Sequence, residues 1–211
     1  MNPGPGRKLD RARGRVPPGG AWSGSLDNQH LPGVDLVHLF RHDDDRGSFL
    51  KLFEADAIMA VDGDARVAEV FTSRSHRGVV RGLHFQTPPR HHAKTVVCIA
   101  GSVRDVVVDL RRGSPTEGQV AQFHLDADAP ARLHVPAGLA HGFQALVDAT
   151  VVAYVTSTGH APEHDQGIRW DSVDVDWPLV PSVISERDRS FPELESFASP
   201  FCWSPPGRAD D

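Results

Sequence analysis

The chain has 211 residues, of which 39% are hydrophobic and 24% are charged, and its net charge is -6 at pH 7. This length accommodates one domain with a substantial core and disfavours two full domains. The negative charge argues against a surface that binds nucleic acid along the whole chain, but it leaves room for a small basic pocket that takes a phosphorylated ligand.

The N-terminal third combines a polar extension with a few short elements. Residues 1–33 are rich in Gly, Pro, Arg and Asn and lack hydrophobic periodicity, so we expect a flexible extension. From residue 34 the pattern predicts a short strand over 34–40, a turn over 42–47, a second strand over 48–53 and a short helix over 54–61.

Between residues 67 and 156, short apolar or β-branched runs are separated by clusters of Gly, Pro, Asp or Ser. Many short strands at close spacing, with no helical pattern between them, predict an antiparallel sandwich or barrel, and a jelly roll fits best. The runs are mostly apolar on both parities, as two sheets closed around a core require. The expected strands cover residues 67–72, 78–86, 94–99, 103–110, 119–125, 131–135, 142–146 and 150–156.

After residue 162 the pattern weakens to loop and short helix, with Trp170 and Trp177 expected to anchor this segment against the barrel. Residues 191–211 are expected to form a C-terminal tail that packs or frays. The sequence thus predicts one all-β domain over 34–190 with short peripheral helices.

The cysteines and the apolar runs bear on the compartment. Cys98 lies in an apolar, strand-like run, where a buried thiol fits a reducing compartment, and with Cys202 it forms no disulfide framework. No apolar run reaches the length of a membrane span, and the N-terminus lacks the hydrophobic region of a signal peptide. We therefore expect a cytoplasmic protein with no membrane or nucleic-acid partner.

Residues 81–86, which read RGLHFQ, place one ionisable imidazole between hydrophobic neighbours on an expected strand. A His held on a strand is positioned more rigidly than one on a loop, which suits proton transfer at a fixed carbon. Taken alone, the hexapeptide fits equally well a structural His84 whose ring nitrogens bond the backbone.

Residues 136–142, which read PAGLAHG, match the PxGxxH element of the cupin β-helix. In metal-binding cupins this His joins an HxH pair and a Glu. Here no second His follows His84 at that spacing, and the adjacent His91 and His92 would point to opposite faces of a strand. With this incomplete ligand set we expect no metal site, and we interpret the imidazoles as acid–base or hydrogen-bonding groups.

From about residue 45 to residue 188 the chain resembles the RmlC-type dTDP-4-dehydrorhamnose 3,5-epimerase family of the cupin superfamily. The resemblance implies a cupin-type double-stranded β-helix and an isomerase without metal or cofactor, usually a homodimer. Such an enzyme inverts carbon 3, carbon 5 or both in a nucleotide-linked 4-keto-6-deoxyhexose during deoxysugar biosynthesis. The motifs that carry it, in the family's order, are residues 81–86, 88–89, 93–94, 105–111, 113–116 and 135–143, Tyr154, and residues 176–179.

The resemblance also assigns roles to single residues. His84 matches the general base and Asp188 the carboxylate paired with it, while Tyr154 matches the acid on the opposite face of the sugar. Lys94 matches the cation beside the keto oxygen. Two arginines, Arg46 and Arg81, match residues that contact the diphosphate. The positions expected to bind substrate are Arg46, Lys51, Glu69, Phe71, Arg81, His141, His160 and Asp165.

These roles are chemically consistent. A ketone at carbon 4 acidifies the hydrogens on carbons 3 and 5, because the carbanion is delocalised onto oxygen as an enolate. A neutral imidazole with a pKa near 6.5 suits the base, and a cation such as Lys94 stabilises the developing negative charge. Inversion requires a proton from the other face, which the phenol of Tyr154 can donate. The guanidinium fork suits a diphosphate.

Three departures from the family pattern concern the pocket. Lys51 replaces a usual Glu, Glu69 and Phe71 replace a Gln and an Asn, and His160 replaces a Tyr found in many members. The replacements at Lys51, Glu69 and Phe71 leave open which nucleotide and which hexose the protein takes. The donor Lys51 could suit a nucleobase other than thymine. His160 leaves open whether one carbon or both are inverted.

Three other functions remain open from the sequence. A keto-isomerase on the same scaffold would move the carbonyl, but the retained Tyr154 argues against it. A non-catalytic cupin that binds nucleotide sugars is compatible with the altered pocket, although the intact set of His84, Lys94, Tyr154 and Asp188 argues against it. A metal-dependent oxygenase ranks last. Asp105 and Asp109, on an otherwise apolar strand, are interpreted as structural.

Overall fold

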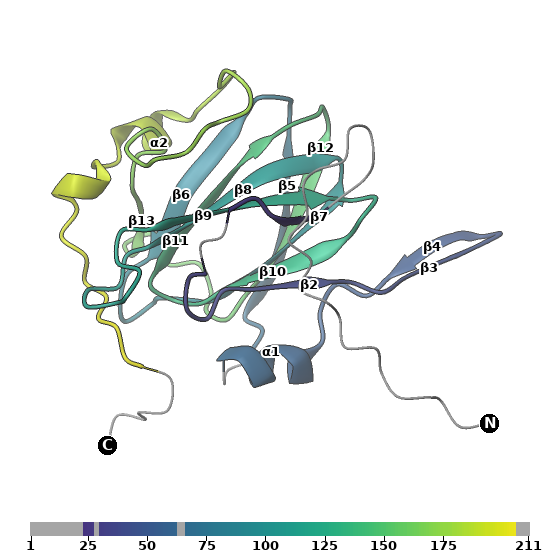
Figure 1. Ribbon diagram of the computed structural model, residues 1–211, viewed down its shortest axis with the longest axis horizontal. Helices are drawn as coiled ribbons and strands as arrows, with labels where there is room; N and C mark the ends of the chain where they lie inside the picture. The colour runs from purple at the N-terminus through teal and green to yellow at the C-terminus, as the bar shows by residue number, and fades with distance from the viewer. Residues whose placement is uncertain (1–22, 28–29, 63–65, 206–211) are drawn as a thin grey trace.

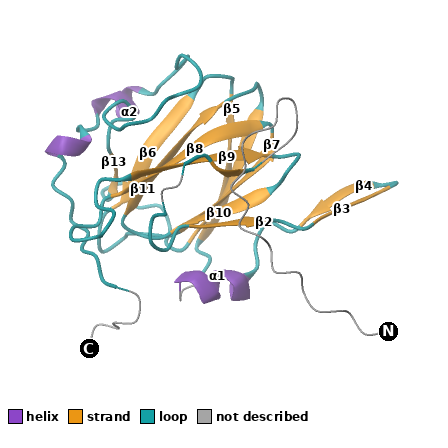
Figure 2. Cartoon of the chain, in the orientation of Figure 1, coloured by secondary structure: helices purple, strands orange, loops and turns teal. Residues whose placement is uncertain are grey.

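The computed structural model describes residues 23–27, 30–62 and 66–205. Two antiparallel sheets pack face to face around the main core, with helices only at the periphery (Figures 1 and 2). This arrangement confirms the predicted all-β jelly roll. Among the described residues, no helix is long and apolar enough to cross a membrane.

The smaller of the two facing sheets has five strands, in the spatial order β2-β10-β7-β12-β5. Its edge strand β5 pairs only with β12 in this chain, so one side of β5 is unpaired among the described strands. The strands are β2 (Asp35–His38), β10 (Ala131–Val135), β7 (Lys94–Ala100), β12 (Thr150–Thr156) and β5 (Glu69–Ser75).

The larger sheet has six strands, in the order β1-β9-β8-β11-β6-β13. Its strands are β1 (Gly24–Ser25), β9 (Val120–Asp126), β8 (Ser102–Asp109), β11 (Leu139–Ala145), β6 (Val80–Gln86) and β13 (Asp165–Gly167). The short β1 and β13 lack a long apolar run, and the sequence did not predict either of them.

Strand β8 explains why successive residues of the runs are apolar, at odd as well as even positions. Val103 and Val107 belong to the core between the sheets, whereas Val106 and Val108 belong to a second cluster on the outer face of the six-stranded sheet. Successive side chains of a strand point to opposite faces, so both faces of this sheet are buried. The C-terminal segment covers the outer face with Trp177 and Phe201, which confirms Trp177 as an anchor.

A third, two-stranded sheet forms a hairpin that projects from the body (Figure 1). It consists of β3 (Arg41–Asp44) and β4 (Gly47–Leu50), joined by a loop of Asp45 and Arg46. The predicted turn over 42–47 is therefore too long, because three of its residues continue a strand. All of β3 is exposed and polar, so no alternation marked it in the sequence. The predicted helix follows as α1 (Ala55–Asp62).

Both predicted terminal segments contain residues that pack on the body. In the expected extension 1–33, β1 pairs with β9 and Leu31 is 1% exposed, whereas residues 1–22 lie outside the described part. In the expected tail, Phe201 is 6% exposed. Between β13 and this tail lie the short helix α2 (Glu186–Ser190) and the 3-10 helix η1 (Leu194–Ser196).

Candidate active site

A cavity of about 670 Å³ lies at one end of the barrel and takes residues from both sheets and from the segment around α2. It brings together many of the residues singled out in the sequence, from both the expected catalytic and the expected substrate-binding groups. Those in its lining are Phe71, Arg81, His84, Lys94, His141, Tyr154 and Asp188.

A close approach of two strands positions the two histidines of this pocket. His84 on β6 and His141 on β11 are direct partners in the ladder. Next to them, a Cβ added to Gly142 would lie 2.5 Å from the carbonyl oxygen of Arg81 and 2.9 Å from the Cα of Gly82. Only glycine lets the two backbones approach this closely.

His84 forms a buried pair with Asp188. Its Nε2 lies 2.8 Å from Asp188 Oδ1, and the side chains are 27% and 6% exposed. A carboxylate can only accept, so the ring nitrogen that faces Asp188 carries the hydrogen and the other nitrogen keeps its lone pair. Burial lowers the pKa of His84, although Asp188 opposes this shift. The imidazole is therefore neutral at pH 7 and able to accept a proton.

The carboxylate of Asp188 is itself held in place by the backbone. Asp188 Oδ2 accepts a hydrogen bond from the N–H of Gly82 at 3.1 Å, and Ser185 caps the N-terminus of α2 by accepting from the N–H of Asp188 at 3.0 Å. Burial alone would raise the pKa of Asp188, but the hydrogen bonds from His84 and Gly82 lower it on balance. The pair is thus oriented as a base and its anionic support.

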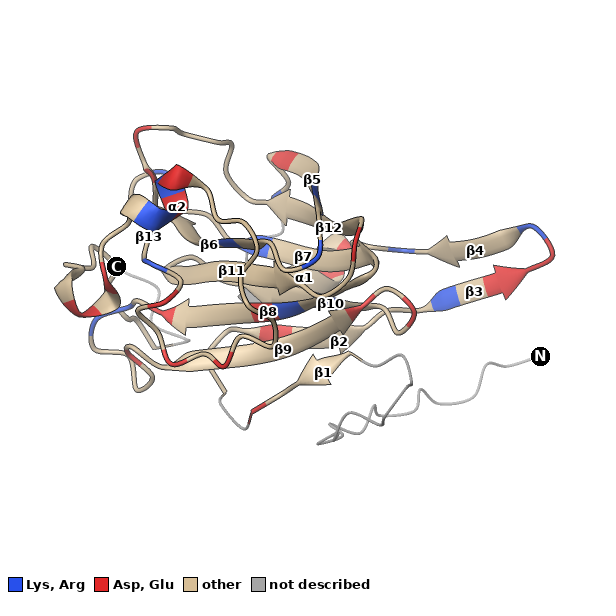
Figure 3. Cartoon of the chain, turned by 90° about the horizontal axis from the view of Figure 1, so that it is seen from above, with Lys and Arg blue, Asp and Glu red and all other residues tan. Residues whose placement is uncertain are grey.

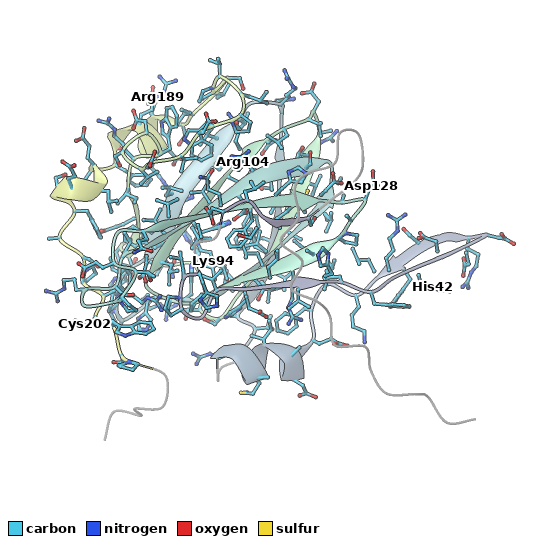
Figure 4. The ribbon with its side chains drawn as sticks, viewed as in Figure 1. His42, Lys94, Arg104, Asp128, Arg189 and Cys202 are labelled. Carbon is cyan, nitrogen blue, oxygen red and sulfur yellow. The ribbon has the colours of Figure 1, made fainter. Side chains whose placement is uncertain are left out.

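Lys94 begins β7 on the opposite sheet and donates from Nζ to the backbone oxygen of His84 at 3.0 Å. Its side chain lies within the body of the molecule (Figure 4). Burial lowers the pKa of Lys94 to about 8, so the ammonium is still mainly charged at pH 7. It places a cation close to His84.

His141 forms a second buried pair, with Asp105 on the neighbouring strand β8. Its Nε2 lies 2.9 and 3.0 Å from the two carboxylate oxygens, and the side chains are 3% and 0% exposed. Burial raises the pKa of Asp105, and His141 opposes this shift. Asp105, interpreted from the sequence as structural, therefore orients an imidazole that lines the pocket.

Tyr154 on β12 lies on the wall opposite His84. Its hydroxyl lies 3.4 Å from Ser73 Oγ, and its ring stacks on that of Phe71 with centroids 4.8 Å apart. Burial raises the pKa of Tyr154, so the phenol keeps its proton throughout the physiological range. A neutral base and a protonated acid thus stand on different sheets with the cavity between them.

Three arginines line this pocket, which therefore has a positive rim in a chain of net negative charge. Basic positions are visible in β6 and in α2 (Figure 3). Arg81 donates to Ser75 Oγ at 3.0 Å and to the backbone oxygen of Arg74 at 3.1 Å. Sequence reasoning found Arg81 but missed Arg74 and Arg187. Arg187 precedes Asp188 in the chain, which was its only available signal, and its contact with the pocket depends on how α2 docks. The neighbours of Arg74 are two serines, which gave no signal.

Five of the expected substrate-binding residues are not part of this lining in their own chain. Arg46 and Lys51 belong to the hairpin region, where they pair with Asp44 and Glu54 respectively. Figure 4 shows this hairpin, marked by His42, away from Lys94 in the body of the molecule. The other three hold nearby segments together. Glu69 accepts from the N–H of His160 at 2.9 Å, and Asp165 pairs with Arg187 at 2.6 Å.

No group of three or more His, Cys, Asp or Glu side chains in the described part of the chain is placed to hold a metal ion. His91 and His92 lie outside the lining of the pocket.

Comparisons with known proteins identify similar epimerases. The family model described as dTDP-4-dehydrorhamnose 3,5-epimerase matches residues 28–196. A protein of that name from Streptomyces griseus is 44% identical over 155 residues, which are 72% of this chain and 77% of the relative.

Two solved structures show that relatives of this fold differ in their reactions. The Legionella pneumophila enzyme RmlC in complex with dTDP-4-keto-L-rhamnose superposes with a TM-score of 0.78 at 30% identity, over 87% of this chain and 100% of that one. A 3'-monoepimerase from Streptomyces bikiniensis in complex with dTDP-quinovose gives a TM-score of 0.73 at 33% identity, over 77% and 84%.

Proposed function

This chain belongs to the dTDP-4-dehydrorhamnose 3,5-epimerase family, a family of isomerases, and from that premise we propose that it epimerises a dTDP-linked 4-keto-6-deoxyhexose. The observation that carries the proposal is the cavity with the His84–Asp188 pair on one wall and Tyr154 on the other. Solved relatives that hold dTDP-sugars support the nucleotide.

The reaction starts at a carbon next to the ketone. His84 removes the proton there through its free ring nitrogen and becomes an imidazolium, which Asp188 stabilises. The electron pair moves onto the keto oxygen, where Lys94 offsets the new negative charge. Tyr154 then donates its proton to the opposite face of the same carbon, and the configuration inverts without any net change in composition.

The positive rim provides the contacts for the diphosphate. Arg81 and Arg187 carry guanidinium groups that match phosphate oxygens in geometry and charge, while the acid–base groups lie deeper in the cavity. His141 is held by Asp105 and lines the same pocket. The sugar is thereby oriented with its keto carbon between the two sheets.

Surfaces that one chain leaves uncovered support a homodimer. Phe40 and Phe49 of the hairpin region are 73% and 59% exposed, and Val70 on the edge strand β5 is 67% exposed. Exposed apolar side chains and an unpaired strand edge favour association with a second copy. Arg46, which is 89% exposed at the hairpin tip, would then reach the pocket of the partner subunit.

The cytoplasm remains the predicted compartment. Cys98 and Cys202 are both free, with Cys98 buried, and free thiols persist in reducing compartments.

Proton NMR of the enzyme with dTDP-4-keto-6-deoxyglucose in deuterated water tests the proposal. We expect deuterium at carbon 3, carbon 5 or both, together with inversion at the labelled carbon. Label at both carbons identifies a double epimerase, and label at one carbon identifies a monoepimerase. No exchange with dTDP-, CDP- and GDP-linked 4-keto sugars would contradict the proposed reaction, and a preference for another nucleotide would correct the substrate.

Two variants separate the base from the acid. We expect His84→Ala to lose both exchange and inversion, because the proton can no longer be removed. Tyr154→Phe should still exchange, but inversion should fall by about 10²-fold or more, which is the usual contribution of a general acid. Full activity of His84→Ala would contradict the assignment of the base.

A further inference from the structure

The ring of Phe71 lies almost flat on the ring of Tyr154. The two centroids are 4.8 Å apart and the planes differ by 16°. The two residues are direct partners across the β5–β12 pair, so the register of the strands fixes this contact. Cross-strand aromatic pairs of this kind stabilise one relative orientation of the two side chains.

Contacts on several sides hold the phenol. The ring of His141 meets the ring of Tyr154 edge-on at 6.3 Å, and the hydroxyl reaches Ser73 Oγ at 3.4 Å. Ser73 follows Phe71 by two residues on β5, so both side chains point to the same face of that strand. One edge strand therefore supplies the stacked ring and the hydrogen-bond partner of the candidate acid.

Burial in the core does not account for Phe71, because its side chain lines the pocket and is 46% exposed. A phenyl ring also has no hydrogen-bond donor or acceptor to offer to a sugar or a phosphate. What it does contact is the ring of Tyr154. Its effect on the reaction is therefore expected to pass through that ring.

We propose that Phe71 is a positioning residue that holds the Tyr154 phenol in line with the reacting carbon, and so sets how often proton removal ends in inversion. The inference rests on the proposed epimerase function. Once His84 has taken the proton, the enolate can be reprotonated by His84 on the same face or by Tyr154 on the opposite face. Only the second outcome depends on the position of the phenol.

The variants to compare are Phe71→Leu, which keeps an apolar side chain without the ring, and Phe71→Tyr, which keeps the ring. In deuterated water, proton NMR gives the rate of deuterium uptake and the rate of inversion. We expect Phe71→Leu to lower the ratio of inversion to exchange by about tenfold or more, since misplacing a reacting group has effects of this size. Phe71→Tyr should restore the ratio.

Thr72→Ala is the matched control, because Thr72 is the other neighbour of Phe71 on β5, is exposed and is not part of the pocket. We expect it to leave the ratio unchanged. If Phe71→Leu instead raises KM with an unchanged ratio, the ring binds substrate and the inference is wrong. If exchange and inversion fall equally, together with a lower Tm, the role of Phe71 is structural and the inference is equally wrong.

A second measurement does not depend on turnover. Tyr154 is the only tyrosine in the chain, so 3-fluorotyrosine labelling gives a single ¹⁹F resonance that reports on this phenol. We expect the resonance to shift or broaden in Phe71→Leu and to stay in place in Thr72→Ala. An unchanged resonance in Phe71→Leu would overturn the positioning role even if the wild-type enzyme turned over no sugar, whereas failure of the wild type alone would overturn only the proposed reaction.

Discussion

Lys94 has a side-chain environment that should appear in the pH dependence of catalysis. Its pKa is lowered to about 8 by burial, so the ammonium is charged below this pH and neutral above it. We expect kcat/KM to fall as the pH rises through about 8, because the neutral amine no longer stabilises the enolate. The acid limb should lie below pH 6.5, since burial lowers the pKa of His84.

A pH profile of kcat/KM checks both limbs, and Lys94→Arg supplies the control. A guanidinium stays charged across the accessible range, so the residual activity of this variant should lack the limb near pH 8. The raised pKa of Tyr154 keeps the phenol protonated there, which removes the other candidate for this limb. An unchanged alkaline limb in Lys94→Arg would contradict the role of Lys94.

Among the elements, strands β6 and β11 approach each other closely beside the site. In Gly142→Ala the new Cβ would lie 2.5 Å from a backbone oxygen, so the strands have to separate. We expect a loss of about 1–3 kcal/mol in the free energy of unfolding, the usual cost of overpacking. Urea denaturation measures it.

Gly159→Ala is the control for that experiment. A Cβ at Gly159 would meet only the ends of the flexible Glu69 and Arg90 side chains, at 3.4 and 3.8 Å. We expect this variant to stay close to the wild type in stability. Equal losses in the two variants would show that the close approach of β6 and β11 is not what Gly142 permits.

The same elements show what the sequence could predict. Short apolar or β-branched runs identified β5 to β12, most of which bury at least one face, and the order of the motifs placed His84, Lys94, Tyr154 and Asp188 in one pocket. The sequence did not predict β3, because an exposed, all-polar strand has no alternation of apolar and polar residues. The contacts of Glu69 with His160 and of Asp165 with Arg187 depend on loop packing between distant segments, which no local pattern encodes.

At the scale of the whole molecule, the projecting hairpin leads to a prediction about assembly. Two-stranded sheets are marginally stable alone, so β3 and β4 gain from packing on a second copy. We expect light scattering after gel filtration to give about twice the chain mass of 23.0 kDa. A mass of one chain at micromolar concentration would contradict the dimer.

The hairpin tip also allows a functional test of that assembly. If Arg46 enters the pocket of the partner subunit, Arg46→Ala should weaken dTDP binding several-fold, about the effect of one lost charge-assisted hydrogen bond. Titration calorimetry measures the affinity. Arg41→Ala, on the same hairpin but at its base, is the control. Equal affinity in the two variants would place Arg46 outside the binding site.

The division of the site between two sheets has a consequence for distant residues. His84 stands on the six-stranded sheet and Tyr154 on the five-stranded one, so the thickness of the apolar layer between them sets the span that the sugar must bridge. Leu133 and Val107 form part of that layer and are not part of the pocket lining, yet a change in their volume would alter the distance between donor and acceptor. Interior packing therefore influences the stereochemical outcome of the reaction. Selection or engineering could change this packing without altering any residue of the pocket.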